Sequence, residues 1–293
     1  PTQTSRTPFD RLRATTAFQT NSLMPRLLAF YLTACAISWL VWSPYVVTGF
    51  PAAWRDSPVP HYLGLLGPMV AAFVFTARER GRPGLRDLLR AMFVPRGGWF
   101  FGGIAPLLPV LLLLVAAAFA TRGNLDTLDW SGLFRSPELA DAGLSPLAYV
   151  ALNVGVVGFG EETGWRGYAL PRLQTRFSPL TATLWLTLGW AVWHWPLFFF
   201  TKTGFYTMGA ADVAGWLVSL ATGSVLFTWL YHGSRGSVLA CALFHGLMDV
   251  AFLADLGEPT IQTTVGALVT VLGVGVLVTG WKWWVGKEKR GIG

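Results

Sequence analysis

Apolar residues gather along the chain in runs of about twenty, with short polar segments between them. About 20 apolar residues are needed for a helix to cross the hydrocarbon core of a membrane, because each residue adds 1.5 Å. The pattern therefore predicts an all-α, polytopic bundle of about eight transmembrane helices. The expected spans are 27–47, 62–77, 99–120, 146–168, 180–200, 216–231, 237–253 and 261–281.

The polar segments divide the chain into four parts. Residues 1–24 form a basic N-terminal arm, and residues 25–144 hold the first spans. Within them, residues 78–96 interleave arginines with leucines at helical spacing, which predicts an amphipathic helix on the membrane surface, or a plain basic loop. Residues 145–255 hold the polar positions that lie deep in apolar runs. Residues 256–293 add the last span and a basic tail.

Composition and charge agree with a membrane protein. Hydrophobic residues make up 53% of the chain and charged residues 13%, whereas soluble domains carry roughly 25% charge. The net charge of +7 does not indicate nucleic-acid binding, because the basic residues stand in loops beside apolar runs. Eight spans put the basic segments on one side and the acidic segments 121–145 and 255–258 on the other. Both termini are then expected in the cytoplasm.

The first polar place inside an apolar run is the stretch Gly-Glu-Glu-Thr-Gly-Trp-Arg-Gly, which begins at Gly160. Glu162 and Arg166 are four residues apart, a spacing that allows an ion pair on one helix face. Arg166 would then neutralise Glu162 and leave Glu161 free to act as a general base. The competing interpretation is a Glu–Arg bridge that anchors the helix at the cytoplasmic surface.

Two further polar places are His194 and the pair His245 and Asp249. Taken alone, they could be a buried histidine and a hydrogen bond between packed helices. Together with Glu161 they are the parts of a hydrolytic site. Glu161 and His194 would activate a water, and His245 and Asp249 would stabilise an oxyanion. Alternatively, these four residues could hold a zinc ion; no other cofactor is expected.

The depths of these residues do not match at first. With the expected span limits, His194 lies about 20 Å from the start of its span, deeper than Glu161 and His245. A helix that begins before the membrane would reconcile them.

Three motifs now follow one another along the chain: Glu161-Glu162-x-x-x-Arg166, Trp190-x-x-x-His194 and His245-x-x-x-Asp249. In this order they resemble the motifs of the CPBP family of intramembrane proteases, which includes the type II CAAX prenyl endopeptidases and the Abi, or bacteriocin-immunity, membrane proteins. The resemblance covers residues 145–255, which it implies are the catalytic core. It implies hydrolysis of a peptide bond in or beside the membrane by a glutamate-based mechanism without metal. In it, Glu161 and His194 would activate the water, and His245 and residue 249 would form the oxyanion hole.

Two residues depart from the family pattern. Trp190 stands in place of phenylalanine, an exchange of one aromatic ring for another. Asp249 stands in place of the usual asparagine, and an ionised aspartate cannot donate to an oxyanion. Asp249 would have to stay protonated, bind metal or play a different part.

We therefore expect an integral membrane endopeptidase of a prokaryotic cell membrane. Its site would face the cytoplasm, lipid would surround it, and its substrate would be a peptide or a membrane protein. No nucleic-acid partner is expected. A non-enzymatic immunity or scaffold protein on the same fold is the first alternative. The second is a proton-coupled transporter that uses Glu161, His194 and Asp249 as a relay, which the lack of an internal repeat disfavours.

Overall fold

The computed structural model describes residues 23–286 except 48, 50, 137, 140, 141, 201 and 202. This part of the chain is helical and contains no strand, so the all-α prediction is confirmed. The expected basic arm lies outside the described residues apart from its last two positions, and the tail beyond residue 286 lies outside them as well.

Five helical runs in the described part are long and apolar enough to cross a membrane, which makes the chain an integral membrane protein of several spans. The first is α2 (Leu23–Trp42) with the turn η3 (Ser43–Tyr45). The second joins α4 (Val59–Gly64) to α5 (Gly67–Phe93), and the third runs through η4 (Phe100–Ile104), η5 (Ala105–Leu107) and α6 (Leu108–Ala120). The last two are α11 (Ala210–Gly233) and α13 (Thr260–Thr279).

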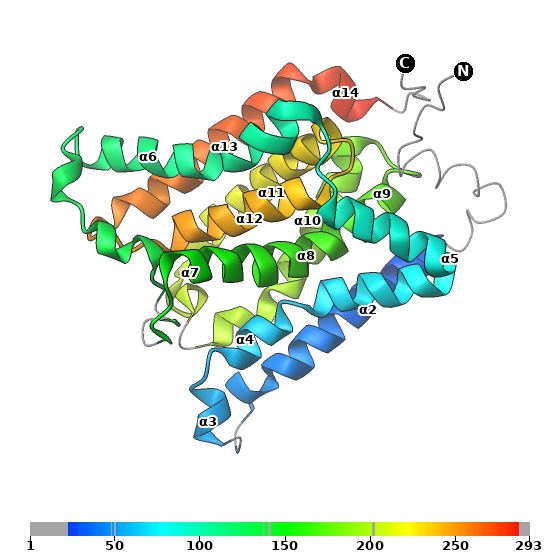
Figure 1. Ribbon diagram of the computed structural model, residues 1–293, viewed down its shortest axis with the longest axis horizontal. Coiled ribbons are helices and arrows are strands. Elements are labelled where there is room, and N and C mark those ends of the chain that lie inside the picture. Colours follow the sequence, from blue (N-terminus) through cyan, green and yellow to red (C-terminus); the bar gives the residue numbers. More distant parts are fainter. Residues whose placement is uncertain are drawn as a thin grey trace.

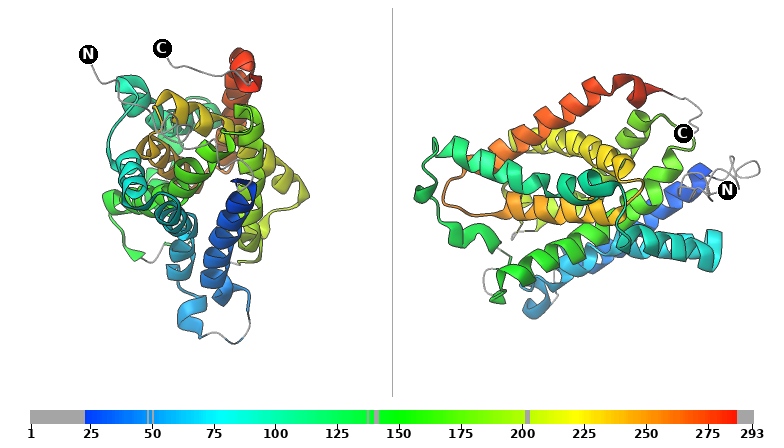
Figure 2. Two further views of the ribbon diagram at one scale, coloured as in Figure 1. Left: turned by 90° about the vertical axis from the view of Figure 1, so that its right-hand side faces the viewer. Right: turned by 45° about the horizontal axis from the view of Figure 1, so that its top comes forward.

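The other three predicted spans are also helical, but they are shorter or more polar. One is a continuous run of α7 (Pro146–Leu152), η9 (Asn153–Gly158), α8 (Phe159–Gly164), η10 (Trp165–Ala169) and α9 (Leu170–Leu173). The other two are α10 (Pro179–Trp193) and α12 (Val238–Leu253). In both figures α12 lies in the middle of the bundle, where it packs against η9, α6, α8 and α11 (Figures 1 and 2). Neighbouring helices thus shield the spans that carry the polar motifs.

Short elements complete the described chain. They are α3 (Ala52–Arg55), η6 (Leu125–Thr127), η7 (Trp130–Phe134), η11 (Trp195–Phe199), η12 (Gly204–Thr207) and α14 (Trp281–Val285).

The sequence predicted that the second span ends at residue 77, but the helix continues beyond it. The helical run continues into the basic segment and changes direction at Gly81, whose φ of 57° and ψ of −151° are not helical. An ion pair of 2.8 Å between Arg80 and Asp87 joins the two sides of this turn. The predicted amphipathic helix is therefore the second half of α5, and it buries Leu88 and Met92 against the bundle.

Two more predicted limits were wrong, and correcting the first brings Glu161 and His194 to similar depths. The run that starts at Pro146 continues to Leu173, because the buried Arg172 is neutralised by Glu79 at 2.6 Å. The helix α10 ends at Trp193 and not at residue 200, because Pro196 has no N–H to donate to the preceding turn and its ring collides with the carbonyl four residues earlier in a regular α-helix. Glu161 then lies about 18 Å from the end of its helix and His194 about 22 Å from the start of α10. Both residues are therefore at similar distances from the connector between the two helices.

Loops of opposite character lie at opposite ends of the bundle. In Figure 1 the turn within α5, the end of α9 and α14 lie toward the right. The loop after α6 and the turn between α12 and α13 lie toward the left. This arrangement agrees with the expected separation of basic and acidic segments, and a cytoplasmic location of the basic end stays a prediction.

Candidate active site

Glu161 and Glu162 lie on α8, between two π-helical turns. The wide turns η9 and η10 stand directly before and after this short helix, and such turns occur often at functional sites. Both carboxylates are buried, with residue exposures of 2% and 0%. Charged groups at this depth need partners, and each glutamate has a different set.

Glu162 pairs with Arg166, as the sequence spacing predicted. Arg166 Nη1 donates to Glu162 Oε1 at 2.9 Å, and both side chains are fully buried. The guanidinium carbon also lies 4.8 Å from the ring centre of Trp190 and 4.2 Å from that of Phe227. The same Oε1 atom contacts His245 Nδ1 at 2.9 Å. Glu162 therefore joins its own helix to α12.

Glu161 has partners of a different kind, and its role as a base stays a prediction. Its Oε2 atom accepts a hydrogen bond of 2.6 Å from the indole of Trp190 and one of 3.3 Å from the indole of Trp165. Indole N–H groups only donate, so they hold the carboxylate in place without competing with it for a proton. Trp165 is four residues from Glu161, so the helical spacing could have indicated that contact; the contact with Trp190 crosses to α10.

His194 caps the C-terminal end of α10. Its Nδ1 atom lies 2.8 Å from the carbonyl oxygen of Trp190, and a carbonyl can only accept. Nδ1 therefore carries the hydrogen, and in the neutral ring Nε2 carries the lone pair. Four aromatic rings surround the imidazole, with centroid distances of 4.9 to 5.8 Å: Trp190, Trp193, Phe205 and Trp216.

Buried tryptophans fix the end of α10 against α2. The Trp193 indole donates to Ser38 Oγ at 2.8 Å, and the Trp39 indole donates to the Trp193 carbonyl at 3.0 Å. These contacts cross more than 150 residues of sequence. They hold the residue next to His194 in a single position.

His245 and Asp249 lie on the same side of α12. With Nδ1 of His245 on Glu162, the Nε2 atom lies 4.0 Å from Asp249 Oδ1, just beyond hydrogen-bond distance. The edge of the imidazole also meets the Trp190 ring at a centroid distance of 5.5 Å.

A close approach of α12 to η9 makes the Glu162–His245 contact possible. A Cβ atom at Gly246 would lie 2.6 Å from the Val154 backbone, and one at Gly158 would collide with the Ala242 carbonyl. Small residues at such crossings let two membrane helices pack backbone to backbone.

Trp190 connects the two halves of the site. Its indole N–H binds Glu161, its carbonyl binds His194, and its ring contacts His245. The structure thus gathers the predicted residues from three separate spans around one side chain. The tryptophan that departs from the family pattern contributes the bond to Glu161, which a phenylalanine could not make.

The possible zinc site has no matching arrangement in the described residues. Among them, no group of three or more His, Cys, Asp or Glu side chains is placed to hold a metal ion. The nitrogen Nδ1 of each of the two histidines is already engaged, by the Trp190 carbonyl and by Glu162 respectively. We therefore derive no chemical step through a metal.

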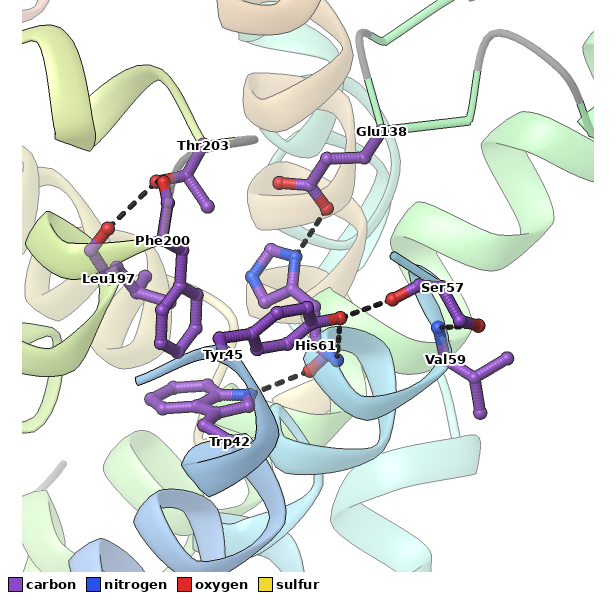
Figure 3. Close-up of polar contacts among 9 residues, drawn as sticks. All are labelled: Trp42, Tyr45, Ser57, Val59, His61, Glu138, Leu197, Phe200 and Thr203. Atoms are coloured by element: carbon purple, nitrogen blue, oxygen red, sulfur yellow. Dashed lines mark hydrogen bonds and ion pairs between the residues drawn. The ribbon is translucent and has the colours of Figure 1, made fainter. Parts of the chain in front are cut away.

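The sequence interpretation missed a second polar cluster, which Figure 3 shows. His61 Nδ1 contacts Glu138 Oε2 at 2.5 Å, and the backbone N–H of His61 donates to Tyr45 Oη at 3.1 Å. Phe200 packs against the Tyr45 ring at 4.6 Å. With Thr203 and others these residues line a small cavity. Residues 61 and 138 lie far apart in the sequence, so no local spacing could have indicated their contact.

Comparison with known proteins gives two matches. Residues 143–251 match the family described as type II CAAX prenyl endopeptidase Rce1-like. A protein named CAAX prenyl protease 2, from Methanococcus maripaludis, is 22% identical to the chain over 215 residues, which cover 69% of this chain and 74% of that protein. These matches support an intramembrane endopeptidase. The expected resemblance to the type II CAAX prenyl endopeptidases is thereby confirmed for residues 143–251.

Proposed function

We propose that this protein hydrolyses a peptide bond within or beside the membrane, with a water activated by Glu161 and His194. The carrying observation is that Trp190 binds both residues, through its indole at 2.6 Å and its carbonyl at 2.8 Å. Trp190 thus orients the Glu161 carboxylate through its side chain and the His194 imidazole through its backbone. The relative named CAAX prenyl protease 2 and the Rce1-like match support the same class of reaction.

In this mechanism Glu161 is the general base. Its carboxylate takes one proton from the water as the water oxygen attacks the carbonyl carbon of the substrate. His194 accepts a hydrogen bond from the second water hydrogen at Nε2, because Nδ1 is engaged by the Trp190 carbonyl. The protonated Glu161 then gives its proton to the leaving nitrogen as the carbon–nitrogen bond breaks. No proton is left over, so the site returns to its starting state.

His245 is the proposed donor to the oxyanion. Since Nδ1 donates to Glu162, the ring can donate from Nε2 only when it is doubly protonated. An ionised Asp249, 4.0 Å from Nε2, would pair with that cation. In this proposal Asp249 does not replace the asparagine donor. Its negative charge favours the imidazolium form, while Glu162, on Nδ1, takes the position that the carboxylate has in a catalytic triad.

The test compares the wild-type protein with Glu161→Gln and His194→Gln on a quenched peptide library in detergent. Asp126→Asn is the matched control, because Asp126 is exposed in the loop after α6. We expect both site variants to lose roughly 100-fold or more in kcat, the usual contribution of a general acid–base group. The control should keep full activity.

Further outcomes separate the alternatives. Cleavage that survives a chelator supports the mechanism without metal, and cleavage restored only by zinc would place the four site residues in a ligand set. Full activity of Glu161→Gln would contradict the proposal. A wild-type protein that cleaves nothing, with a biological effect that Glu161→Gln preserves, would favour the immunity or scaffold alternative.

A further inference from the structure

A series of polar side chains leads from the surface of the bundle to the candidate active site. It begins at the cavity of Figure 3, where His61 and Glu138 keep 16% and 14% of their side-chain surfaces exposed. It continues through buried hydroxyl groups and ends at Asp249. We call this series the polar file; its members are His61, Glu138, Ser136, Tyr62, Tyr149 and Asp249.

The segment after η7 places the middle of the file. Glu138 is tied to His61, and Leu139 packs in a small hydrophobic cluster with Tyr149 and Val250, the neighbour of Asp249. Ser136 accepts a backbone bond from Leu139 at 3.0 Å and is 4% exposed. One short stretch of chain therefore reaches from the surface cavity to α12.

Hydroxyl groups bridge the remaining distance. Ser136 lies beside the side chains of Tyr62 and Tyr149, and both tyrosines pack in the hydrophobic cluster that contains Val250, the neighbour of Asp249. Tyr149 Oη and Ser136 Oγ are buried and have no hydrogen-bond partner among the described residues; the same holds for Oδ1 of Asn153, one turn after Tyr149. Buried polar groups are rarely left unpaired, and ordered water is the usual partner of those without a protein partner.

We propose that the polar file delivers the water consumed at the Glu161–His194 site. A hydrolase inside a membrane uses one water per turnover, and the aromatic rings around His194 offer that water no hydrogen-bond acceptor. The file offers donors and acceptors from the surface to Asp249, which lies 4.0 Å from the ring of His245. This inference rests on the proposed hydrolysis, whereas the presence of water in the file can be measured without it.

The first experiment is radiolytic hydroxyl-radical labelling of the wild-type protein in detergent, read by mass spectrometry. Radicals form from bound water as well as bulk water, so a buried side chain reacts only where water reaches it. Tyr149 and Tyr168 are 1% and 0% exposed, and Tyr168 already donates to Glu79 at 2.7 Å. We expect Tyr149 to be labelled several-fold faster than Tyr168, and equal, slow labelling of the two would overturn the inference.

The second experiment obstructs the file with Ser136→Val, which removes a hydroxyl and adds a methyl group. The matched control is Ser224→Val, because Ser224 is buried and its Oγ also lacks a partner among the described residues, but it lies on α11 outside the file. Ser136→Val should slow the labelling of Tyr149 and lower kcat about fivefold at unchanged KM, the equivalent of one ordinary hydrogen bond to the water. Ser224→Val should change neither the labelling rate of Tyr149 nor kcat.

Two outcomes would count against the inference: slower labelling of Tyr149 without a change in kcat, and a wild-type protein that cleaves no peptide. Slower labelling of Tyr149 in Ser136→Val with an unchanged kcat would show that water enters the file without supplying the reaction. Should Ser136→Val fail to fold, Tyr62→Phe removes a file hydroxyl without added volume and is measured in its place. If the wild-type protein cleaves no peptide, the supply role falls with the proposed function, and the labelling of Tyr149 still reports whether water enters.

Discussion

Replacing Arg166 by methionine should strongly destabilise the protein. The Arg166–Glu162 pair is 2.9 Å long, and both side chains are fully buried. Loss of one partner from such a pair leaves an uncompensated charge and costs about 3–5 kcal/mol. The loss also removes the stacking of the guanidinium on Trp190 and Phe227. For a chain of this size each kcal/mol lowers the melting temperature by about 2–4 °C, so we expect a decrease of roughly 10 °C.

The two free cysteines provide the assay. Cys241 is buried and Cys35 is partly buried, so a thiol-reactive fluorogenic dye reports unfolding in detergent as the temperature rises. The control is Arg176→Met, which removes an exposed arginine of the connector after α9 and should change stability by less than about 0.5 kcal/mol.

A second variant tests the cause of the loss. Glu162→Gln combined with Arg166→Met removes both charges, so the double variant should be more stable than Arg166→Met alone. Equal melting of Arg166→Met and Arg176→Met would refute the reasoning, because a buried guanidinium that matters electrostatically cannot be removed without cost. A double variant less stable than Arg166→Met would show that packing, and not charge, dominates.

Two further predictions concern glycines. Gly246→Ala forces a Cβ to within 2.6 Å of the Val154 backbone, so it should lower the free energy of unfolding by about 1–3 kcal/mol. It should also lower activity, because it moves His245 away from Glu162. Gly215→Ala, which has open space around it, is the control in the same melting and cleavage assays. Gly81→Ala places a side chain at a φ of 57° and ψ of −151° and should lower the free energy of unfolding by about 1–3 kcal/mol, measured by the dye assay.

The sequence predicted the helices better than their ends. Runs of apolar residues located each long helical run of the described residues, because burial in lipid requires long apolar helices. The ends of the helices depended on individual residues, and one pair of residues could have predicted the change of direction within α5. Gly81 is followed closely by Pro83, and both residues disturb a regular helix. Nothing in the sequence pattern indicated that Arg172 would be buried, because its partner Glu79 comes from a different span.

The candidate site shows the same division between local and long-range information. The Glu162–Arg166 contact followed from helical spacing alone. The bond from Trp190 to Glu161 and the contact of Glu162 with His245 depend on how three helices pack. A motif can name these residues, but it cannot state which carboxylate faces which helix.

The adjacent glutamates explain how one short helix organises two others. Neighbouring residues on a helix point about 100° apart, so Glu161 reaches Trp190 on α10 and Glu162 reaches His245 on α12. Arg166 neutralises only Glu162, which leaves the charge of Glu161 held by two neutral indoles. The hydrogen-bond donors to Glu161 are thus neutral, whereas Glu162 is bound by a guanidinium. The partners therefore favour Glu161 as the base and Glu162 as the residue that positions His245.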